Sequence, residues 1–262
     1  MNYTTVETEL KQGIAYIWLN RPDVRNAMNS HMFTDLHHAL DAAIEDRKAR
    51  VIVLGGRGKA FCAGGDLSWM KTAKQMSASQ AKIDSLPLAF LLRKIHDCPK
   101  PTVARVHGAA FAGGMGLVAA CDIAVCSTDV KFSLSEVKLG LIPATISPYV
   151  VKAMGSNQSR RYFITGEVLD AVEAHRIGFV HEQVAPEELD NCLNKILGHL
   201  IQGAPNALEE TKQLLRDVTH ATIDDALSED TAERIARIRA SDEAQEGIKA
   251  FFEKRPPSWI PK

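Results

Sequence analysis

Hydrophobic and polar residues alternate along the first two thirds of the chain in a way that predicts strands followed by helices. Residues 14–19, 50–54 and 101–106 form apolar or β-branched runs of strand length. The second run is apolar enough to be buried on both faces. A helix is expected from about Asn29 or Ser30, where apolar residues begin to recur at helical spacing. This alternation predicts an α/β fold with a largely parallel sheet.

The rest of the chain is predicted to contain more helix than strand. Small and apolar residues over 109–120 predict a tightly packed helix, and residues 123–126 and 132–134 predict two short strands. Strand signals nearly vanish after about residue 160. Pro205 is well placed to begin a helix, and residues 223–254 read as one long charged helix that a Pro-Pro pair stops.

These patterns divide the chain into an α/β core, residues 1–200, and a C-terminal helical region, residues 201–262. Such a region is expected to pack on its own core or on a neighbouring subunit. The 262 residues, 45% of them hydrophobic, suffice for a large core near the upper size of one domain.

Charge and cysteine content narrow the class of protein. The formal net charge is −1, so no basic excess indicates binding to nucleic acid or to an anionic membrane. The five cysteines are odd in number and lack paired spacing, which indicates free thiols in a reducing compartment. No apolar stretch approaches the roughly 20 residues of a membrane span. We expect a soluble, cytoplasmic protein, although a matrix enzyme after removal of its transit peptide would have the same sequence features.

Several common catalytic motifs are absent. Gly58-Lys59 is followed by Ala60, so the phosphate-binding Walker A loop fails, and no G-x-G-x-x-G fingerprint is present. The sequence contains neither H-E-x-x-H nor G-x-S-x-G. We therefore expect no metal site, and neither nucleoside triphosphate nor serine hydrolase chemistry.

Two glycine-rich segments, 59–67 and 107–116, each follow a predicted strand. Ligands of open α/β sheets bind beyond the carboxyl ends of strands. Gly65 and Gly113 could present backbone N–H groups to a ligand, since glycine places no side chain in the way. An N–H at the start of a helix is also unpaired and lies at the positive end of the helix dipole. Spacing alone leaves close packing as an equally good explanation of these glycines.

Four motifs in order resemble those of the crotonase superfamily, the enoyl-CoA hydratase and isomerase family. These motifs are LNRPDVRNAMN, KAFCAGGDL, HGAAFAGGMGL followed by ACDIA, and SEVKLGLIP. The resemblance implies a spiral of β-β-α turns with a C-terminal helical region, assembled as trimers or paired trimers. It also implies an acyl-coenzyme A thioester as substrate, with the coenzyme belonging to the substrate and no separate cofactor.

The resemblance assigns roles to particular residues. It implies that Gly65 and Gly113 form the oxyanion hole, and that Glu136 is the catalytic residue. It further implies a set of residues that bind the coenzyme or the acyl group: Ala27, Ala63, Asp66, Leu67, Gly116, Ser135 and Gly140.

One position departs from the pattern of common hydratases, which hold two glutamates on the attacking water. Glu136 occupies the later position, but Gly116 stands at the earlier one. Glu136 could act alone if an apolar pocket raises its pKa; the alternative is a structural ion pair with Lys138. Gly116 is expected to leave room beside the acyl chain.

The surrounding sequence is similar to bacterial methylglutaconyl-CoA and isohexenylglutaconyl-CoA hydratases, whose substrates are branched and carry a second carboxylate. The PATISP segment departs from the glycine-rich stretch of common hydratases, and its Thr145 or Ser147 could bind a substrate carboxylate or the water, or cap a helix. Three hypotheses remain: hydration of a branched enoyl-CoA, Δ3-Δ2 isomerisation through Glu136, and acyl-CoA binding without catalysis.

Overall fold

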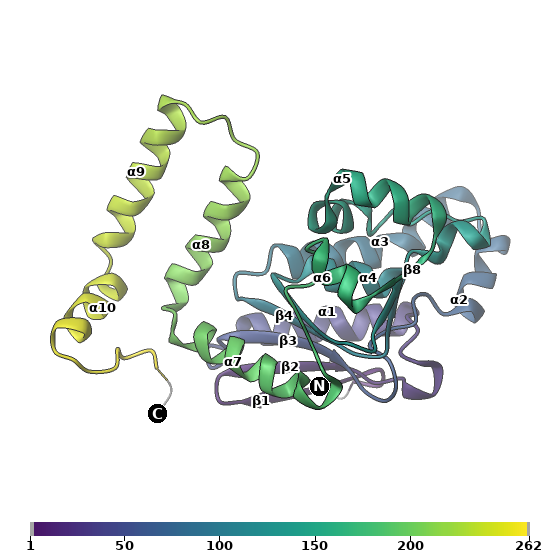
Figure 1. Ribbon diagram of the computed structural model, residues 1–262, viewed down its shortest axis with the longest axis horizontal. Helices are drawn as coiled ribbons and strands as arrows, with labels where there is room; N and C mark the ends of the chain where they lie inside the picture. The colour runs from purple at the N-terminus through teal and green to yellow at the C-terminus, as the bar shows by residue number, and fades with distance from the viewer. Residues whose placement is uncertain (1–2, 261–262) are drawn as a thin grey trace.

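A six-stranded sheet organises the core of the computed structural model, which describes residues 3–260 apart from the side chains of residues 72 and 73 (Figure 1). Its strand order is β1-β2-β3-β4-β6-β9. Only the pair of β1 and β2 is antiparallel; the other neighbours are parallel, as predicted. The strands are β1 (Val6–Lys11), β2 (Ile14–Leu19), β3 (Val51–Gly56), β4 (Thr102–Val106), β6 (Ile123–Ser127) and β9 (Glu182–Val184).

Helices cover both faces of this sheet. On one face pack α1 (Ser30–Glu45) and α3 (Ala78–His96), through residues such as Met32, Phe33 and Leu91. Helix α1 begins as predicted, because the Asn29 side chain accepts a hydrogen bond from the Met32 amide. Helix α7 (Leu189–Gln202) covers the other face and contributes three buried leucines.

A second sheet, in the order β5-β7-β8, corrects two predictions. Residues 109–120 were expected to be one helix, but β5 (Ala109–Phe111) is a strand and α4 (Gly113–Ala120) starts after it. Strand β5 forms because it pairs with β7 (Lys131–Ser133), a partner distant in sequence. Strands β8 (Val168–Asp170) and β9 lie beyond residue 160, where strand signals had vanished; each is only three residues long.

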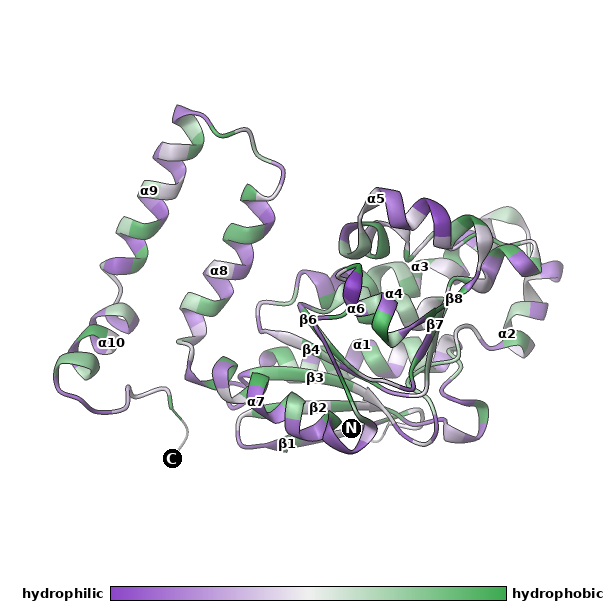
Figure 2. Cartoon of the chain, in the orientation of Figure 1, coloured by the Kyte–Doolittle hydropathy of each residue, from purple (hydrophilic) through white to green (hydrophobic). Residues whose placement is uncertain are grey.

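The remaining helices and 3₁₀ turns complete the core. They are η1 (Pro22–Val24), α2 (Leu67–Thr72), η2 (Ala73–Gln75), η3 (Ser135–Leu139), α5 (Ser147–Thr165), α6 (Ala171–Arg176) and η4 (Pro186–Glu188). Figure 2 shows hydrophobic residues concentrated along the strands of the large sheet, where the core lies. Within residues 3–260, no helix combines the length and the apolar character that a membrane crossing requires.

The C-terminal helices α8 (Pro205–Val218), α9 (Asp225–Arg239) and α10 (Asp242–Phe252) project from this body (Figure 1). Pro205 is in the first turn of α8, as predicted. The single helix expected over 223–254 is instead two helices, because Ser241 caps a new one by accepting a hydrogen bond from the Ala244 amide.

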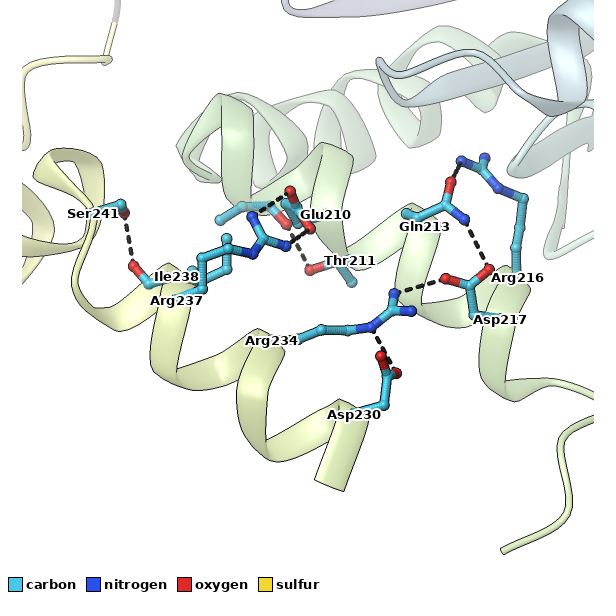
Figure 3. A network of polar contacts seen from close by, with 11 residues as sticks. Glu210, Thr211, Gln213, Arg216, Asp217, Asp230, Arg234, Arg237, Ile238 and Ser241 are labelled. Carbon is cyan, nitrogen blue, oxygen red and sulfur yellow. Dashed lines mark hydrogen bonds and ion pairs between the residues drawn. The ribbon is translucent and has the colours of Figure 1, made fainter. Parts of the chain in front are cut away.

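Ion pairs hold α8 and α9 together (Figure 3). Arg234 of α9 bonds Asp217 of α8 at 2.7 Å, and both terminal nitrogens of Arg237 bond the Glu210 carboxylate. Neither helix has a buried residue. Long polar side chains therefore link α8 to α9.

Candidate functional site

The first glycine loop is held beside Met28 by backbone pairing. The Met28 amide donates to the Gly64 carbonyl, and the Asp66 amide donates to the Met28 carbonyl, both at 2.8 Å. In a parallel ladder the residue between two such bonds turns its own N–H to the opposite side. The N–H of Gly65 therefore faces away from Met28, and within residues 3–260 it has no hydrogen-bond acceptor.

The second glycine loop ends at the first residue of α4. Gly113 is that residue, and its N–H has no acceptor in the described part of the chain, as expected for a helix start. Ala112 before it adopts φ 49° and ψ −120°, a region that side chains rarely occupy. Its amide donates to the Ser133 carbonyl at 2.8 Å, and this bond helps to hold the strained turn.

Backbone bonds bring the two loops into contact. Cys62 donates to the Ala109 carbonyl at 3.0 Å and accepts from the Phe111 amide at 2.9 Å. A Cβ atom at Gly64 would lie 3.1 Å from the Cβ of Ala112, so the residues that precede the two glycines touch. Two unpaired amides are thus carried by adjoining segments, an arrangement that can polarise a carbonyl oxygen.

Glu136 lies in η3, just after β7. Because β7 pairs with β5, and α4 follows β5 closely in the chain, Glu136 lies near the start of α4. Its Oε2 atom is buried and has no hydrogen-bond partner among the described residues. Burial raises the pKa of this carboxyl, a hydrogen bond from its own backbone amide lowers it by less, and no cation among the described residues opposes the rise.

The alternative of an ion pair with Lys138 is not supported. The Lys138 side chain lies against Gly166, whose Cβ position is 3.2 Å from its Cε, and its charge acts on Glu167. Glu136 is thus a partly buried carboxylate without a counter-ion among the described residues, a setting suited to a general acid or base.

Two further predicted site residues flank Glu136. Ser135 opens η3 and is half-buried, while Gly140 closes it with φ 73°. A Cβ atom at Gly140 would meet nothing within 4 Å, so its glycine is explained by backbone conformation. Contact of either residue with substrate stays a prediction.

The expectation that Gly116 opens room beside the acyl chain is wrong. Gly116 is buried, and a Cβ atom there would lie 2.8 Å from the Cβ of Ile146 and closer still to its Cγ2. Ile146 belongs to the PATISP segment and is itself 1% exposed. Gly116 and the PATISP segment both depart from the pattern of common hydratases. These two departures are therefore linked, because Ile146 of that segment fills the space beside Gly116.

Neither polar candidate in that segment caps a helix. The N-cap of α5 is Ile146, without a side-chain hydrogen bond, and the Ser147 hydroxyl donates to the Ala144 carbonyl at 2.8 Å. The hydroxyl of Thr145 makes no hydrogen bond to the described residues, so its donor is free for a ligand, whereas that of Ser147 is used.

The predicted coenzyme-binding segments are joined by Arg21, which the sequence analysis did not single out. One terminal nitrogen of Arg21 bonds the Asp66 carboxylate at 3.0 Å, and the other donates to the Ala27 carbonyl. Burial alone would raise the pKa of Asp66, but the hydrogen bonds from Arg21 and the Ser68 amide outweigh it and lower that pKa. The Asp66 side chain is therefore engaged within the protein, which leaves its backbone for a coenzyme.

Asn26 supports the same region and was also missed. It is fully buried, accepts from the Arg21 amide at 2.8 Å, and donates to the carbonyls of Arg57 and Ala60. Its only sequence signal was its place in LNRPDVRNAMN. Ala63 is half-buried beside this network, and Leu67 is 61% exposed, so both can be reached by a ligand.

The chain is similar to known proteins over nearly its whole length. The family model described as enoyl-CoA hydratase/isomerase matches residues 9–262. The crystal structure of an enoyl-CoA hydratase from Shewanella pealeana is 39% identical, with a TM-score of 0.94 over 98% of this chain and 96% of that one.

Two curated relatives match over nearly their full lengths. The crotonyl-CoA hydratase of Syntrophomonas wolfei is 30% identical over 100% of both chains. The 2,3-dehydroadipyl-CoA hydratase of Escherichia coli is 29% identical over 95% of this chain and 96% of its own.

Proposed function

Because the chain belongs to the enoyl-CoA hydratase/isomerase family, we propose that it adds water reversibly across the C2=C3 bond of a branched enoyl-CoA. The proposed substrate is methylglutaconyl-CoA, and the product is 3-hydroxy-3-methylglutaryl-CoA. The observation that best supports this proposal concerns the Glu136 carboxyl. One of its oxygens is buried and has no hydrogen-bond partner among the described residues, and its pKa is raised.

The reaction follows from three groups. Glu136 removes a proton from water, and the resulting hydroxide bonds to C3 of the enoyl group. The C2=C3 electron pair moves towards the thioester, whose oxygen accepts hydrogen bonds from the Gly65 and Gly113 amides. Glu136 then returns the proton to C2, so one water is consumed and no further cofactor takes part.

The choice of substrate rests on sequence similarity and on chemistry. The segment around Glu136 is similar to hydratases of branched, carboxylated acyl groups, and one relative is named for the dicarboxylic acyl group dehydroadipyl. The Thr145 hydroxyl is the candidate donor to the second carboxylate of the substrate.

A Δ3-Δ2 isomerase is the second candidate, and the single carboxylate favours it. In that reaction Glu136 would carry a proton between C2 and C4, and no water would be added. Ile146 fills the space at Gly116, where a second carboxylate would otherwise stand, so the structure provides no second group for water activation there.

An assay of the purified protein against straight, branched and carboxylated enoyl-CoA esters tests the proposal. We expect methylglutaconyl-CoA to give the highest kcat/KM and a product that gains the mass of water. Exchange of solvent deuterium into substrate without net hydration would establish the isomerase instead. Tight acyl-CoA binding without turnover of any ester, unchanged in Glu136→Gln, would show a non-catalytic binding protein.

We also propose that the protein works as a trimer or a pair of trimers. The C-terminal helices carry large apolar residues that the chain itself leaves open: Phe251 is 80% exposed and Phe252 is 77% exposed. Exposed apolar residues of this size commonly mark an interface between subunits.

A further inference from the structure

A polar groove lies on the α7 face of the large sheet, beside the first turn of that helix. Its walls include Trp18 of β2, Arg57 after β3, and Arg105 and His107 at the end of β4. The groove has a volume of about 640 Å³, within the range of roughly 300–1,000 Å³ that small-molecule sites occupy. None of the residues assigned to the thioester lines it.

The indole of Trp18 forms a fixed floor for this groove. Trp18 pairs with Gly55 of the neighbouring strand, and a Cβ atom at Gly55 would lie 2.6 Å from the ring atom Cε3. Only glycine at this position lets the indole lie across the sheet. The Tyr16 ring stacks beside it at 5.8 Å with an interplanar angle of 2°.

Two guanidinium groups lie against this one indole. The Cζ of Arg57 is 4.5 Å from the ring centroid, and that of Arg105 is 5.8 Å from it. Each arginine bonds a carboxylate through Nε alone: Arg57 to Glu7 at 2.8 Å and Arg105 to Asp190 at 2.6 Å. Within residues 3–260, neither uses its terminal nitrogens in a hydrogen bond, so both forks keep free donors.

Two other nitrogens in the groove are buried and unpartnered among the described residues: Trp18 Nε1 and His107 Nδ1. The other ring nitrogen of His107 lies 2.9 Å from the Gly58 carbonyl, which can only accept, so that nitrogen carries a proton. An indole N–H is always a donor, and buried donors are nearly always satisfied. The wall of the groove therefore contains one buried donor that no described residue satisfies.

Three cationic side chains and two carboxylates line the groove, and Glu7 outside it pairs with Arg57. The cations are Lys11, Arg57 and Arg105, and the carboxylates are Asp129 and Asp190. Asp190 is engaged by Arg105, and Asp129 accepts from the Ser127 hydroxyl. We propose that this groove binds a phosphate group, as free phosphate or on a small metabolite, at a site separate from the thioester site.

Isothermal titration calorimetry of the full-length protein with inorganic phosphate, at constant ionic strength in chloride, tests the proposal. We expect one saturable site, and a loss of at least about tenfold in affinity in Arg57→Gln and in Arg105→Gln, because each removes charge-assisted donors. Asp190→Asn should bind phosphate more tightly, since it removes a negative charge beside Arg105 while its amide oxygen can still accept from Nε. Trp18→Phe keeps the ring but loses the N–H, and should weaken binding.

Arg161→Gln is the matched control. The Arg161 guanidinium also lies over an aromatic ring, Tyr162 at 5.1 Å, but it bonds Glu167 through both Nε and Nη2. Its substitution should leave phosphate binding unchanged. The opposite signs expected for Arg105→Gln and Asp190→Asn distinguish a lost ligand contact from a general loss of folding.

Three results would overturn the proposal. The first is no saturable binding of phosphate by the wild-type protein. The second is equal affinity in wild type, Arg57→Gln and Arg105→Gln. The third is displacement of phosphate by adenosine 3′,5′-bisphosphate with the same dependence on Arg105, because the groove would then hold the phosphates of the coenzyme itself.

Discussion

The Glu136 carboxyl has a buried, unpartnered oxygen and a raised pKa, and the proposed chemistry depends on it. Glu136→Gln should lower kcat by about 10²–10⁴-fold, the usual contribution of a positioned acid or base. Binding of coenzyme A should change little. Steady-state kinetics and calorimetry check both parts. Glu167→Gln, on a surface ion pair with Arg161, should remain within about twofold of wild type. A similarly small effect at Glu136 would remove it from the mechanism.

The raised pKa of Glu136 predicts the direction of two pH effects, one on activity and one on stability. A base must be ionised, so the acid limb of kcat/KM should lie above the ordinary carboxyl pKa of 4.5. The folded pKa is raised, so this group favours folding most below its unfolded pKa, and that contribution is lost as pH rises through the folded pKa. Glu136→Gln should therefore melt no lower than wild type at neutral pH. Its relative stability should fall in acid. Melting curves against pH test this; a Gln variant less stable only at neutral pH would contradict it.

Gly116 is a packing residue, because Ile146 fills the space of its absent side chain. Gly116→Ala should lower the free energy of unfolding by about 1–3 kcal/mol, as overpacked cores do. Gly198 in α7 is the matched control, since a Cβ atom there meets nothing within 4 Å. Gly198→Ala should be neutral or stabilising by up to about 1 kcal/mol. Chemical denaturation measures both; equal effects at the two sites would show that Ile146 yields easily.

At the level of elements, the start of α4 supplies the proposed donor of Gly113. Gly113→Pro deletes that N–H at the first helical residue, where no intrahelical bond is lost, and should cost about 10²–10³ in rate. Gly113→Ala is its control: it adds a similar Cβ against the flexible end of Met28 but keeps the N–H. Circular dichroism confirms folding, and kcat is compared. If both variants lose activity equally, contact with Met28 accounts for the loss and the donor role fails.

Contacts within the protein hold both glycine loops in place, one at the start of α4 and the other around Gly65. Ala112 holds an unfavourable backbone conformation directly before Gly113. Arg21 ties Asp66 and Ala27 together on the side of Gly65. Such strain persists only where the surrounding structure imposes it. The two loops are therefore fixed before any ligand arrives, as electrostatic catalysis requires.

At the scale of the whole molecule, the C-terminal helices expose large apolar side chains that the rest of the described chain does not cover. The double variant Phe251→Glu/Phe252→Glu should convert the proposed trimer into a species of the 28.7 kDa chain mass, because charge is costly in an apolar interface. Light scattering after size-exclusion chromatography gives the mass. The wild-type melting temperature should also rise with protein concentration. An unchanged mass in the variant would place the interface elsewhere.

The sequence alone determined the features that depend on neighbouring residues. Apolar periodicity and the Asn29 cap located α1, Pro205 located α8, and four ordered motifs identified the family that the full-length match confirms. These signals are local, since helix periodicity, caps and proline act within a few residues. The assignments of Gly65, Gly113 and Glu136 to catalysis also came from motifs, and the structure supplies their surroundings.

Only the tertiary structure decided features that join distant segments. Ala109–Phe111 is a strand because Cys62 and β7 pair with it, and the long tail is divided where Ser241 caps a new helix. Ile146 closes the space at Gly116, and two arginines, one after β3 and one in β4, meet on Trp18. Such contacts depend on packing between remote residues, and packing density rather than local propensity sets which side chain fills a given space.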